Sequence, residues 1–307
     1  MKNPLVTIGI PTFNRANSFL KCSLESALMQ TYGNFEIIVS DNCSTDGTQE
    51  FVRQYTDSRI RYHRHEPALR PEGNANYCLE KANGEYFLLL HDDDLIDPDF
   101  IETCIDSVRD NCVGLVRTGF RKIDAKGKVL SIKKNPHANS SLFEFYQAVL
   151  KGNAVITLCN TLYYTERLRA IGGFHSKAYT YQDIVATVKM ASEHHRVDIE
   201  EPMASYRIHG GKLGKATEVN RWFADSAFIV EVLCELMPDR TDFFRSEGMK
   251  IRCRQCLNRA RRLTIWRRPI AYYLLYNAFG RYSVGAFRDE LSRKFGKIWM
   301  RAMRNSK

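Results

Sequence analysis

The first ninety residues alternate short apolar runs with stretches of helical periodicity. Leu20, Leu24 and Leu28 recur four positions apart, which is the spacing of one helix face. Strands are predicted for residues 5–10, 35–40, 59–63 and 85–90, and helices for residues 18–30, from about residue 48, and for residues 73–82. Because parallel strands need crossover connections of this kind, the pattern predicts a doubly wound α/β sheet.

The remainder of the chain changes from a mixed pattern to a helical one. The predicted elements are a helix from residue 98 to about 109, a hairpin of residues 113–123 and 129–132, a helix over 141–150, a strand over 154–158, a helix over 182–193, and short strands over 197–200 and 203–206. Beyond residue 215 the periodicity is helical throughout, with breaks near Pro238, Pro269 and Gly280. We therefore expect two domains, residues 1–212 and residues 213–307.

Polar residues follow three of the predicted strands. These clusters are residues 11–15, Asp41 with Asn42, and residues 91–94. In open sheets of this kind ligands bind beyond the carboxyl ends of the strands. The three clusters are therefore expected to line one crevice.

The last cluster, His91-Asp92-Asp93-Asp94, directly follows an apolar run at residues 86–90. Adjacent carboxylates repel one another and lose hydration beside a buried sheet, so a cation is their natural partner. Oxygen ligands suit both Mg²⁺ and Mn²⁺. The alternative is a solvated acidic turn that binds no ligand.

The composition is that of a globular protein. With 307 residues and 44% apolar content, the chain can bury a large core. No stretch reaches 18 uninterrupted apolar residues, so no membrane span is expected. The nine cysteines are scattered, and Cys253-x-x-Cys256 lacks a second ligand pair, which favours reduced thiols in a cytoplasmic protein over disulfides or a zinc site.

Positive charge is concentrated near the C-terminus. The net charge is +10, but residues 240–307 hold 18 Lys and Arg against 4 Asp and Glu, whereas residues 1–239 hold 27 against 31. Such a basic block usually meets an anionic membrane surface or nucleic acid. Nucleic acid is the less favoured partner, because no recognisable reader motif accompanies the block and the acidic crevice would repel a polyanion.

Three motifs in order resemble the family 2 glycosyltransferases of GT-A fold. They are VTIGIPTFNR at residues 6–15, IIVSDNCSTDGT at residues 37–48 and GEYFLLLHDDD at residues 84–94. The resemblance covers roughly residues 4–212, so residues 1–212 would be a GT-A transferase domain with a mixed, doubly wound sheet flanked by helices. Residues 213–307 would be a basic helical C-terminal extension. In that family a sugar moves, with inversion, from a nucleoside diphosphate to an acceptor hydroxyl.

The resemblance also implies a nucleotide pocket. Thr12 and the Pro11 backbone would line it, and the Asp41 carboxylate would accept a hydrogen bond from the imide of a uracil or thymine base. The implied donor is therefore a UDP-sugar or a dTDP-sugar. An alternative role for Asp41 is to cap the following turn. Asn14 and Arg15 would either touch the diphosphate or start a helix.

The same comparison assigns the acidic cluster. Asp92 would face the ribose, and Asp93 would bind Mn²⁺ or Mg²⁺, which bridges the diphosphate oxygens and offsets charge on the leaving group. His91 stands where many members have Asp, and Asp94 is expected behind these residues or as a helix cap. His209, in a late loop beside two glycines, resembles the His that many members place near the metal. Its alternative is a plain surface histidine.

Inverting transfer needs a base for the acceptor hydroxyl, and Asp183 is the candidate. It matches the second residue of the family's Glu-Asp motif, although Gln182 replaces the Glu. Its alternative role is an N-terminal helix acid that favours the helix dipole. Residues 218–222, EVNRW, resemble the Gln-x-x-Arg-Trp motif of processive members, but Glu replaces Gln. We interpret that match as coincidence and expect addition of a single sugar.

The basic tail contains a predicted amphipathic helix. Leu291, Phe295, Ile298 and Ala302 form a stripe flanked by Lys and Arg residues. With the aromatic run at residues 272–276, this pattern suits docking on anionic lipid at the inner face of the cytoplasmic membrane. A helical appendix packed on the catalytic domain is the alternative.

The leading prediction is thus a metal-dependent inverting glycosyltransferase that acts on a glycan or a lipid-linked acceptor, as in surface polysaccharide synthesis. Two other classes stay open. One is a catalytically inactive nucleotide-sugar binder, which the departures at His91 and Gln182 make conceivable. The other is a polyanion-binding or nucleic-acid-binding protein that uses its basic tail.

Overall fold

The computed structural model describes residues 3–16, 18–108, 113–138, 140–193, 195–209, 219–261, 263 and 265–279. The chain divides into two compact units. The first comprises Met1–Phe145, Gly152–His175 and Gln182–Gly210, and the second comprises Tyr146–Lys151, Ser176–Tyr181 and Gly211–Lys307. The domain boundary expected between residues 212 and 213 falls outside the described residues and stays a prediction.

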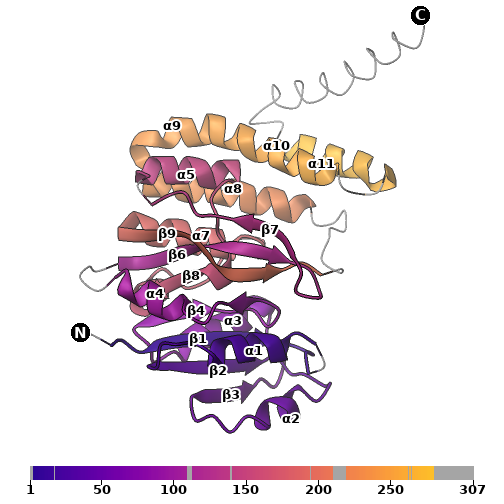
Figure 1. Cartoon of the computed structure of the whole chain (residues 1–307). Coiled ribbons are helices and arrows are strands. Elements are labelled where there is room, and N and C mark those ends of the chain that lie inside the picture. The colour runs from indigo at the N-terminus through magenta and orange to yellow at the C-terminus, as the bar shows by residue number, and fades with distance from the viewer. Residues whose placement is uncertain are drawn as a thin grey trace, which may run out of the picture. The chain divides into compact units, whose positions relative to one another are not determined.

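The first unit is built on one nine-stranded mixed sheet (Figure 1). Its strand order is β3-β2-β1-β4-β8-β6-β9-β5, and β7 pairs with β6. The strands are β1 (Val6–Thr12), β2 (Phe35–Asp41), β3 (Ile60–Arg64), β4 (Tyr86–Leu89), β5 (Leu95–Ile96), β6 (Val113–Ile123), β7 (Val129–Lys133), β8 (Thr161–Tyr164) and β9 (His195–Arg207).

The N-terminal half of this sheet is parallel and has the predicted βαβ form. β1 pairs in parallel with both β2 and β4, and β2 pairs in parallel with β3. The crossover helices are α1 (Leu20–Leu28), α2 (Thr48–Arg53) and α3 (Pro71–Glu80). Every residue of β2 is buried, as expected for a strand covered on both faces. The predicted doubly wound sheet is therefore confirmed.

The other half of the sheet is mixed. β8 runs antiparallel to β4 and β6, and β9 runs parallel to β6. The predicted hairpin of β6 and β7 is present. Further helices of this unit are α4 (Phe100–Asp106), α6 (Thr165–Ala170) and α7 (Gln182–Glu193). The last of these has the predicted bounds.

Two predictions in this half were wrong. Residues 154–158 are not a strand: Thr157 and Asn160 form a reciprocal capping box around the short helix η1 (Leu158–Asn160), and the strand is β8, which follows directly. The two short strands predicted at 197–200 and 203–206 are one strand, β9. The register shifts between Arg117 and Phe120 of β6 accommodate Pro202 without ending the pairing.

The second unit is helical, as the sequence predicted. Its elements are α8 (Val219–Leu236), η3 (Pro238–Arg240), α9 (Thr241–Phe243), η4 (Phe244–Gly248), α10 (Met249–Ala260), η5 (Ile265–Arg267) and α11 (Arg268–Phe279), and α5 (Leu142–Lys151) contributes its C-terminal part. Helices α8, α10 and α11 pack against one another. No described helix is long and apolar enough to cross a membrane. The amphipathic helix predicted near residues 291–302 lies outside the described residues.

Candidate functional site

The ends of β1, β2 and β4 bring several predicted site residues to one edge of the sheet. Thr12 and Asp41 are register partners on β1 and β2, and Pro11 is the partner of Ser40. The Thr12 hydroxyl donates to Asp92 Oδ2 at 2.8 Å, and Arg15 Nε lies 3.6 Å from the same oxygen. Thr12 and Arg15 therefore share the Asp92 carboxylate, which follows Thr12 by 80 positions in the sequence.

Asp92 has an unusual electrostatic environment. Burial raises the pKa of Asp92 to about 6, and the charge of Asp93 acts in the same direction. The Thr12 hydrogen bond and the Arg15 charge oppose this rise without cancelling it. A carboxyl with a raised pKa beside other carboxylates is typical of sites that bind or react with ligands.

Asn14 joins two loops at this edge. Its backbone N–H donates to Ser44 Oγ at 2.8 Å, and its side-chain oxygen accepts from Thr45 N–H at 2.8 Å. Its φ of +53° lies in the left-handed region, which Asn tolerates better than most residues. Neither Asn14 nor Arg15 starts a helix, because α1 begins at Leu20. Asn14 thus fixes the loop that presents Arg15.

Asp41 is held from two sides. Its Oδ1 accepts from Ser44 N–H at 3.0 Å, and its Oδ2 accepts from the Tyr62 hydroxyl at 2.5 Å. Asp41 has no exposed surface, and burial together with this carboxylate raises the pKa of Tyr62. Asp41 therefore caps the turn, which was the alternative left open for it. Each carboxylate oxygen can still accept a second hydrogen bond.

The loop after β4 gathers a second set of acidic groups. Ligand atoms of His91, Asp93 and Asp94 all lie within 4.8 Å of one another. His209 Nε2 lies 2.7 Å from Asp93 Oδ2, although 116 residues separate the two in the sequence. Carboxylate oxygens together with imidazole nitrogens suit a divalent ion such as Mn²⁺, so this donor set fits the expected metal. The predicted metal ligands were Asp93 and His209. The structure adds His91 and Asp94 as candidate ligands beside Asp93.

Backbone contacts fix this loop in place. The backbone N–H of Arg207, at the end of β9, donates to Asp94 Oδ1 at 2.9 Å, and Arg207 Nε donates to the Asp93 carbonyl at 2.7 Å. The ring of Phe19 lies 5.2 Å from the His209 ring and 4.7 Å from Arg207 Cζ. The Phe19 ring therefore packs against both the His209 ring and the Arg207 cation.

Asp183 is the second residue of α7, where a negative charge favours the helix dipole. Tyr206 connects it electrostatically with the acidic loop. Partial burial raises the pKa of Tyr206 to about 12, and the charges of Asp94, Asp93 and Asp183 add to this rise. The phenol of Tyr206 therefore lies within electrostatic range of all three carboxylates. The sequence offered only one signal for Tyr206, its position three residues before His209.

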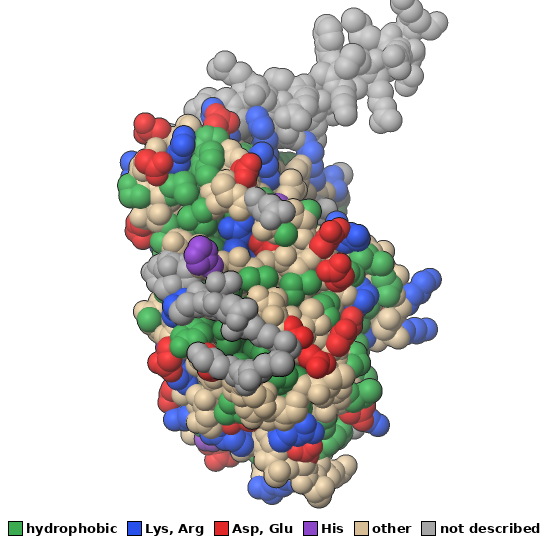
Figure 2. Space-filling model, turned by 60° about the vertical axis from the view of Figure 1, so that its left-hand side comes forward, with side chains coloured by type: hydrophobic (Ala, Val, Ile, Leu, Met, Phe, Trp, Pro, Cys, Tyr) green, Lys and Arg blue, Asp and Glu red, His purple; other side chains and the backbone are tan. Residues whose placement is uncertain are grey.

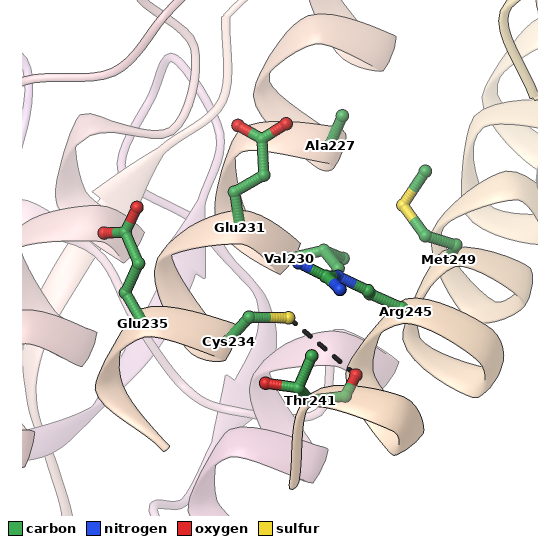
Figure 3. Close-up of a pocket in the computed structure, with 8 residues that line it drawn as sticks. All are labelled: Ala227, Val230, Glu231, Cys234, Glu235, Thr241, Arg245 and Met249. Carbon is green, nitrogen blue, oxygen red and sulfur yellow. Dashed lines mark hydrogen bonds between the residues drawn. The ribbon is translucent and has the colours of Figure 1, made fainter. Parts of the chain in front are cut away.

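A cavity of about 470 Å³ lies elsewhere, in the helical unit (Figure 3). Glu231 and Glu235 of α8 and Arg245 of η4 are its charged lining residues. The Cys234 thiol points toward the Thr241 carbonyl, at 3.9 Å. None of the predicted site residues lines this cavity.

Comparison with known proteins gives a family match over the part of the chain that holds these residues. The family model for glycosyl transferase family 2 matches residues 7–168, which is more than half of the chain. This range contains the Thr12, Asp41 and Asp92–Asp94 positions.

Three curated relatives are similar to the chain. An uncharacterized glycosyltransferase of Rickettsia felis is 30% identical over 209 residues, 67% of this chain and 33% of that protein. The putative teichuronic acid biosynthesis glycosyltransferase TuaG of Bacillus subtilis is 28% identical and aligns over 72% of this chain and 84% of TuaG. The glucosyltransferase WfgD of Escherichia coli, described as UDP-Glc:alpha-D-GlcNAc-diphosphoundecaprenol beta-1,3-glucosyltransferase, is 37% identical over 31% of this chain and 37% of WfgD. The chain thus spans only about a third of the first relative.

Two solved structures have a similar fold. TarS residues 1–349 of S. aureus, in complex with UDP-GlcNAc, has a TM-score of 0.66 at 16% identity and covers 90% of this chain and 80% of its own. The mannosyltransferase PcManGT of Pyrobaculum calidifontis, with GDP-Man and Mn²⁺, has a TM-score of 0.56 at 18% identity and covers 96% and 81%. At such identities the likeness concerns the fold, which is GT-A.

Proposed function

This chain belongs to glycosyl transferase family 2, and on that premise we propose that it transfers one sugar with inversion from a UDP-sugar or dTDP-sugar. The acceptor is a hydroxyl of a glycan or a lipid-linked saccharide, as in surface polysaccharide synthesis. The observation that carries the proposal is the gathering of Thr12, Arg15 and Asp92 beside the acidic loop, beyond the carboxyl ends of parallel strands.

The donor would occupy the crevice beside Pro11 and Thr12. Asp41 has no exposed surface in this structure, so contact with the base requires the side chains around it to move. Asp41 would then accept the imide hydrogen of the base through a lone pair that Tyr62 and Ser44 leave unused. Asp92 would accept from the ribose hydroxyls. Arg15 is positively charged and partly exposed next to Asp92, which suits contact with the diphosphate.

Asp93, with His91, Asp94 and His209 around it, would hold Mn²⁺ or Mg²⁺. Such an ion supplies electrostatic stabilisation of the diphosphate leaving group. The His91 imidazole provides a ligand where many members of the family have a carboxylate, so the departure from the family pattern retains a donor atom at this position. The Mn²⁺ complex of PcManGT supports the assignment by likeness of fold.

Asp183 would act as the general base. In an inverting displacement it takes the proton of the acceptor hydroxyl while that oxygen attacks the anomeric carbon from the face opposite the diphosphate. The charge of Asp183 adds to the rise in the pKa of Tyr206, as do the charges of Asp93 and Asp94. Asp183 also belongs to the same compact unit as the proposed donor site.

The test is thermal-shift binding of UDP, dTDP, GDP and CMP with and without Mn²⁺. We expect stabilisation by UDP or dTDP that requires both Mn²⁺ and Asp93, and its loss in Asp93→Ala. Asp239→Ala is the matched control, because Asp239 is an exposed acid of the helical unit. No shift with any nucleotide would instead favour a degenerate or non-enzymatic protein.

Peripheral attachment to an anionic membrane is part of the proposal. On η5 and α11, Trp266, Ile270 and Tyr273 recur at helical spacing and are 86%, 57% and 66% exposed, while Ala271, Leu275 and Phe279 are buried. Arg267 and Arg268 lie beside them and suit anionic headgroups. An aromatic and basic face of this type fits a lipid-linked acceptor, because such a substrate is confined to the bilayer.

Vesicle flotation tests this attachment. We expect the protein to float with vesicles that contain anionic lipid and not with zwitterionic ones, and Trp266→Ser to weaken flotation. Failure to float with anionic vesicles would contradict the membrane proposal.

On the face drawn in Figure 2, the described Lys and Arg side chains are scattered among acidic and neutral ones. The nucleic-acid alternative concerns the basic tail, of which residues 280–307 lie outside the described residues, and it stays a prediction.

A further inference from the structure

A strand at the edge of the first unit exposes aliphatic side chains. Among the described strands β7 pairs with β6 alone, so its other edge has no strand beside it (Figure 1). Val129, Leu130 and Ile132 of this strand are 47%, 54% and 58% exposed. Exposed aliphatic residues are normal when they are scattered singly, but three within four positions form a patch of the kind that meets a partner. The hairpin of β6 and β7 is therefore a candidate docking surface.

A bulge brings two of these side chains to the same face of the sheet. Ile123 pairs with Val129 and Arg121 pairs with Ile132, and the register shift between them leaves Leu130 without a partner. Directly paired residues lie on one face, and Arg121 and Ile123 share a face because they are two positions apart. Val129 and Ile132 therefore share that face, although a regular strand would put residues three positions apart on opposite faces.

The hairpin is bonded to the acidic loop of the candidate site. Arg207 of β9 is the register partner of Ile123 on its other side, so Arg207 lies in line with Val129 across three strands. Arg207 Nε donates to the Asp93 carbonyl at 2.7 Å, and Arg207 Nη1 donates to the Asp124 carbonyl in the hairpin turn at 3.1 Å. One guanidinium thus joins the loop to the hairpin.

Lysines flank the aliphatic residues. Residues 124–134 hold four Lys and one Asp. All four lysines are exposed: Lys126, Lys128, Lys133 and Lys134. Of these, only Lys134 has an ion-pair partner within the described residues, Glu200 at 3.0 Å. Aliphatic side chains between unpaired cations are complementary to a surface with an apolar interior and anionic headgroups, which is an anionic bilayer.

Two features of the strand disfavour a protein as the partner. A further strand added to β7 needs a continuous row of backbone hydrogen bonds, and the bulge at Leu130 interrupts that row. A second copy of this chain would also bring like charges together, because an antiparallel pairing centred on β7 sets Lys128 opposite Lys133. A bilayer needs no row of hydrogen bonds and attracts the lysines.

We propose that the β6–β7 hairpin docks on the surface of an anionic bilayer, with Val129, Leu130 and Ile132 at the level of the headgroups and the lysines on the lipid phosphates. This attachment belongs to the first unit and is separate from the aromatic face proposed on η5 and α11. It rests on the proposed function, because a lipid-linked acceptor gives the docking its use. Arg207 fixes the hairpin to the acidic loop, so the bilayer surface lies beside the proposed metal ligands.

The test measures partition of the full chain onto vesicles of anionic and of zwitterionic lipid, by flotation over a range of lipid concentrations. We expect the double variant Leu130→Ser, Ile132→Ser to partition roughly tenfold more weakly onto anionic vesicles, since two aliphatic side chains are lost from the contact. The double variant Lys126→Ser, Lys128→Ser should partition about 25-fold more weakly, since each cation near the surface contributes about fivefold. Zwitterionic vesicles should bind all of these proteins weakly.

Two matched controls change exposed side chains at the other end of the parallel strands. Met29 is 66% exposed and Lys81 is 43% exposed. They follow α1 and α3, which lead into the starts of β2 and β4, whereas the acidic loop follows the end of β4. Met29→Ser and Lys81→Ser should therefore partition as the native protein does.

Each outcome has a separate meaning. Native partition in either double variant overturns docking by the hairpin and leaves the attachment proposed for α11 untouched. A native dimer that Leu130→Ser, Ile132→Ser converts to a monomer in light scattering would make the patch an interface between copies, which also overturns it. The thermal shift with UDP and Mn²⁺ is measured on the same proteins. Its absence from the native protein is a failure of the proposed function, whereas a normal shift with unchanged partition is a failure of the hairpin alone.

Discussion

Two mostly buried aspartates, Asp92 and Asp198, have pKa values that are shifted in opposite directions. Their side chains are 13% and 1% exposed. Burial raises the pKa of Asp92 to about 6, because Thr12 and Arg15 only partly compensate it and Asp93 adds a like charge. Burial also opposes ionisation of Asp198, but Arg117, Asn135 and Arg196 outweigh it and hold the pKa of Asp198 below its ordinary value.

The difference distinguishes a carboxylate in a candidate ligand site, Asp92, from a carboxylate that stabilises the fold, Asp198. Asp198 ion-pairs with Arg117 and accepts from Asn135 Nδ2 at 2.9 Å and Arg196 Nε at 2.8 Å, and both guanidinium groups lie 4.5 Å from the Phe145 ring. Its partners are all supplied by the protein. The carboxylates around Asp92 lie beside one another instead, so their negative charges repel. A bound cation would offset this repulsion.

Asp183→Asn should have the largest effect on activity. Asn cannot take a proton, so we expect transfer to fall by roughly 10²–10⁴-fold. The free energy of unfolding should fall by no more than about 1 kcal/mol, the contribution of a charge at a helix N-terminus. Steady-state kinetics with a UDP-sugar and thermal unfolding of the same preparation measure the two quantities. A variant that loses stability but keeps its rate would place Asp183 with the structural carboxylates.

Asp198→Asn should have the converse effect. Removal of one partner leaves the Arg117 guanidinium buried without its counter-charge, which typically costs about 3–5 kcal/mol of unfolding free energy. The folded fraction should retain its nucleotide affinity. Urea unfolding of the native protein and the variant measures the loss. A change below about 1 kcal/mol would show that this network does not stabilise the fold, as exposed pairs often do not.

The contribution of Asp198 should also depend on pH in a defined direction. Because the pKa of Asp198 is lower in the folded state, its contribution is present above the unfolded pKa of about 3.9 and is lost as the pH falls. The stability difference between the native protein and Asp198→Asn should therefore shrink as the pH is lowered from about 6 to about 3. Unfolding curves at several pH values measure it. A difference independent of pH would mean that charge does not cause it.

Thr12→Val should have the smallest effect. The change removes one hydrogen bond, from the Thr12 hydroxyl to Asp92 Oδ2, at nearly constant volume. We expect a loss of about 1 kcal/mol in unfolding free energy. Nucleotide affinity should fall as well if Thr12 lines the donor pocket, and calorimetric titration with UDP and Mn²⁺ measures this. An unchanged affinity would limit Thr12 to supporting Asp92.

The sequence predicted the parts of the fold that depend on local pattern. Strands β1 to β4 and the helices between them follow from periodicity, and helix α7 was predicted to the residue. The strand β8 was missed, because the buried Asn160 and the capping box of η1 leave no alternating pattern ahead of it. The single strand β9 was divided in two at Pro202, since the sequence does not show that shifts in its partner strand accommodate a proline.

For the candidate site, the sequence by itself determined which chemical groups gather at the strand ends. The order of the motifs indicated the family. The run His91–Asp94 predicted a cation site from four neighbouring residues alone. Only the tertiary structure decided the partners of those groups. Thr12 meets Asp92 across 80 residues and Arg207 meets Asp94 across 113, whereas the family resemblance had already placed His209 near Asp93. Such pairs form because folding brings distant segments together, and contact between distant segments leaves no periodic signal in a single sequence.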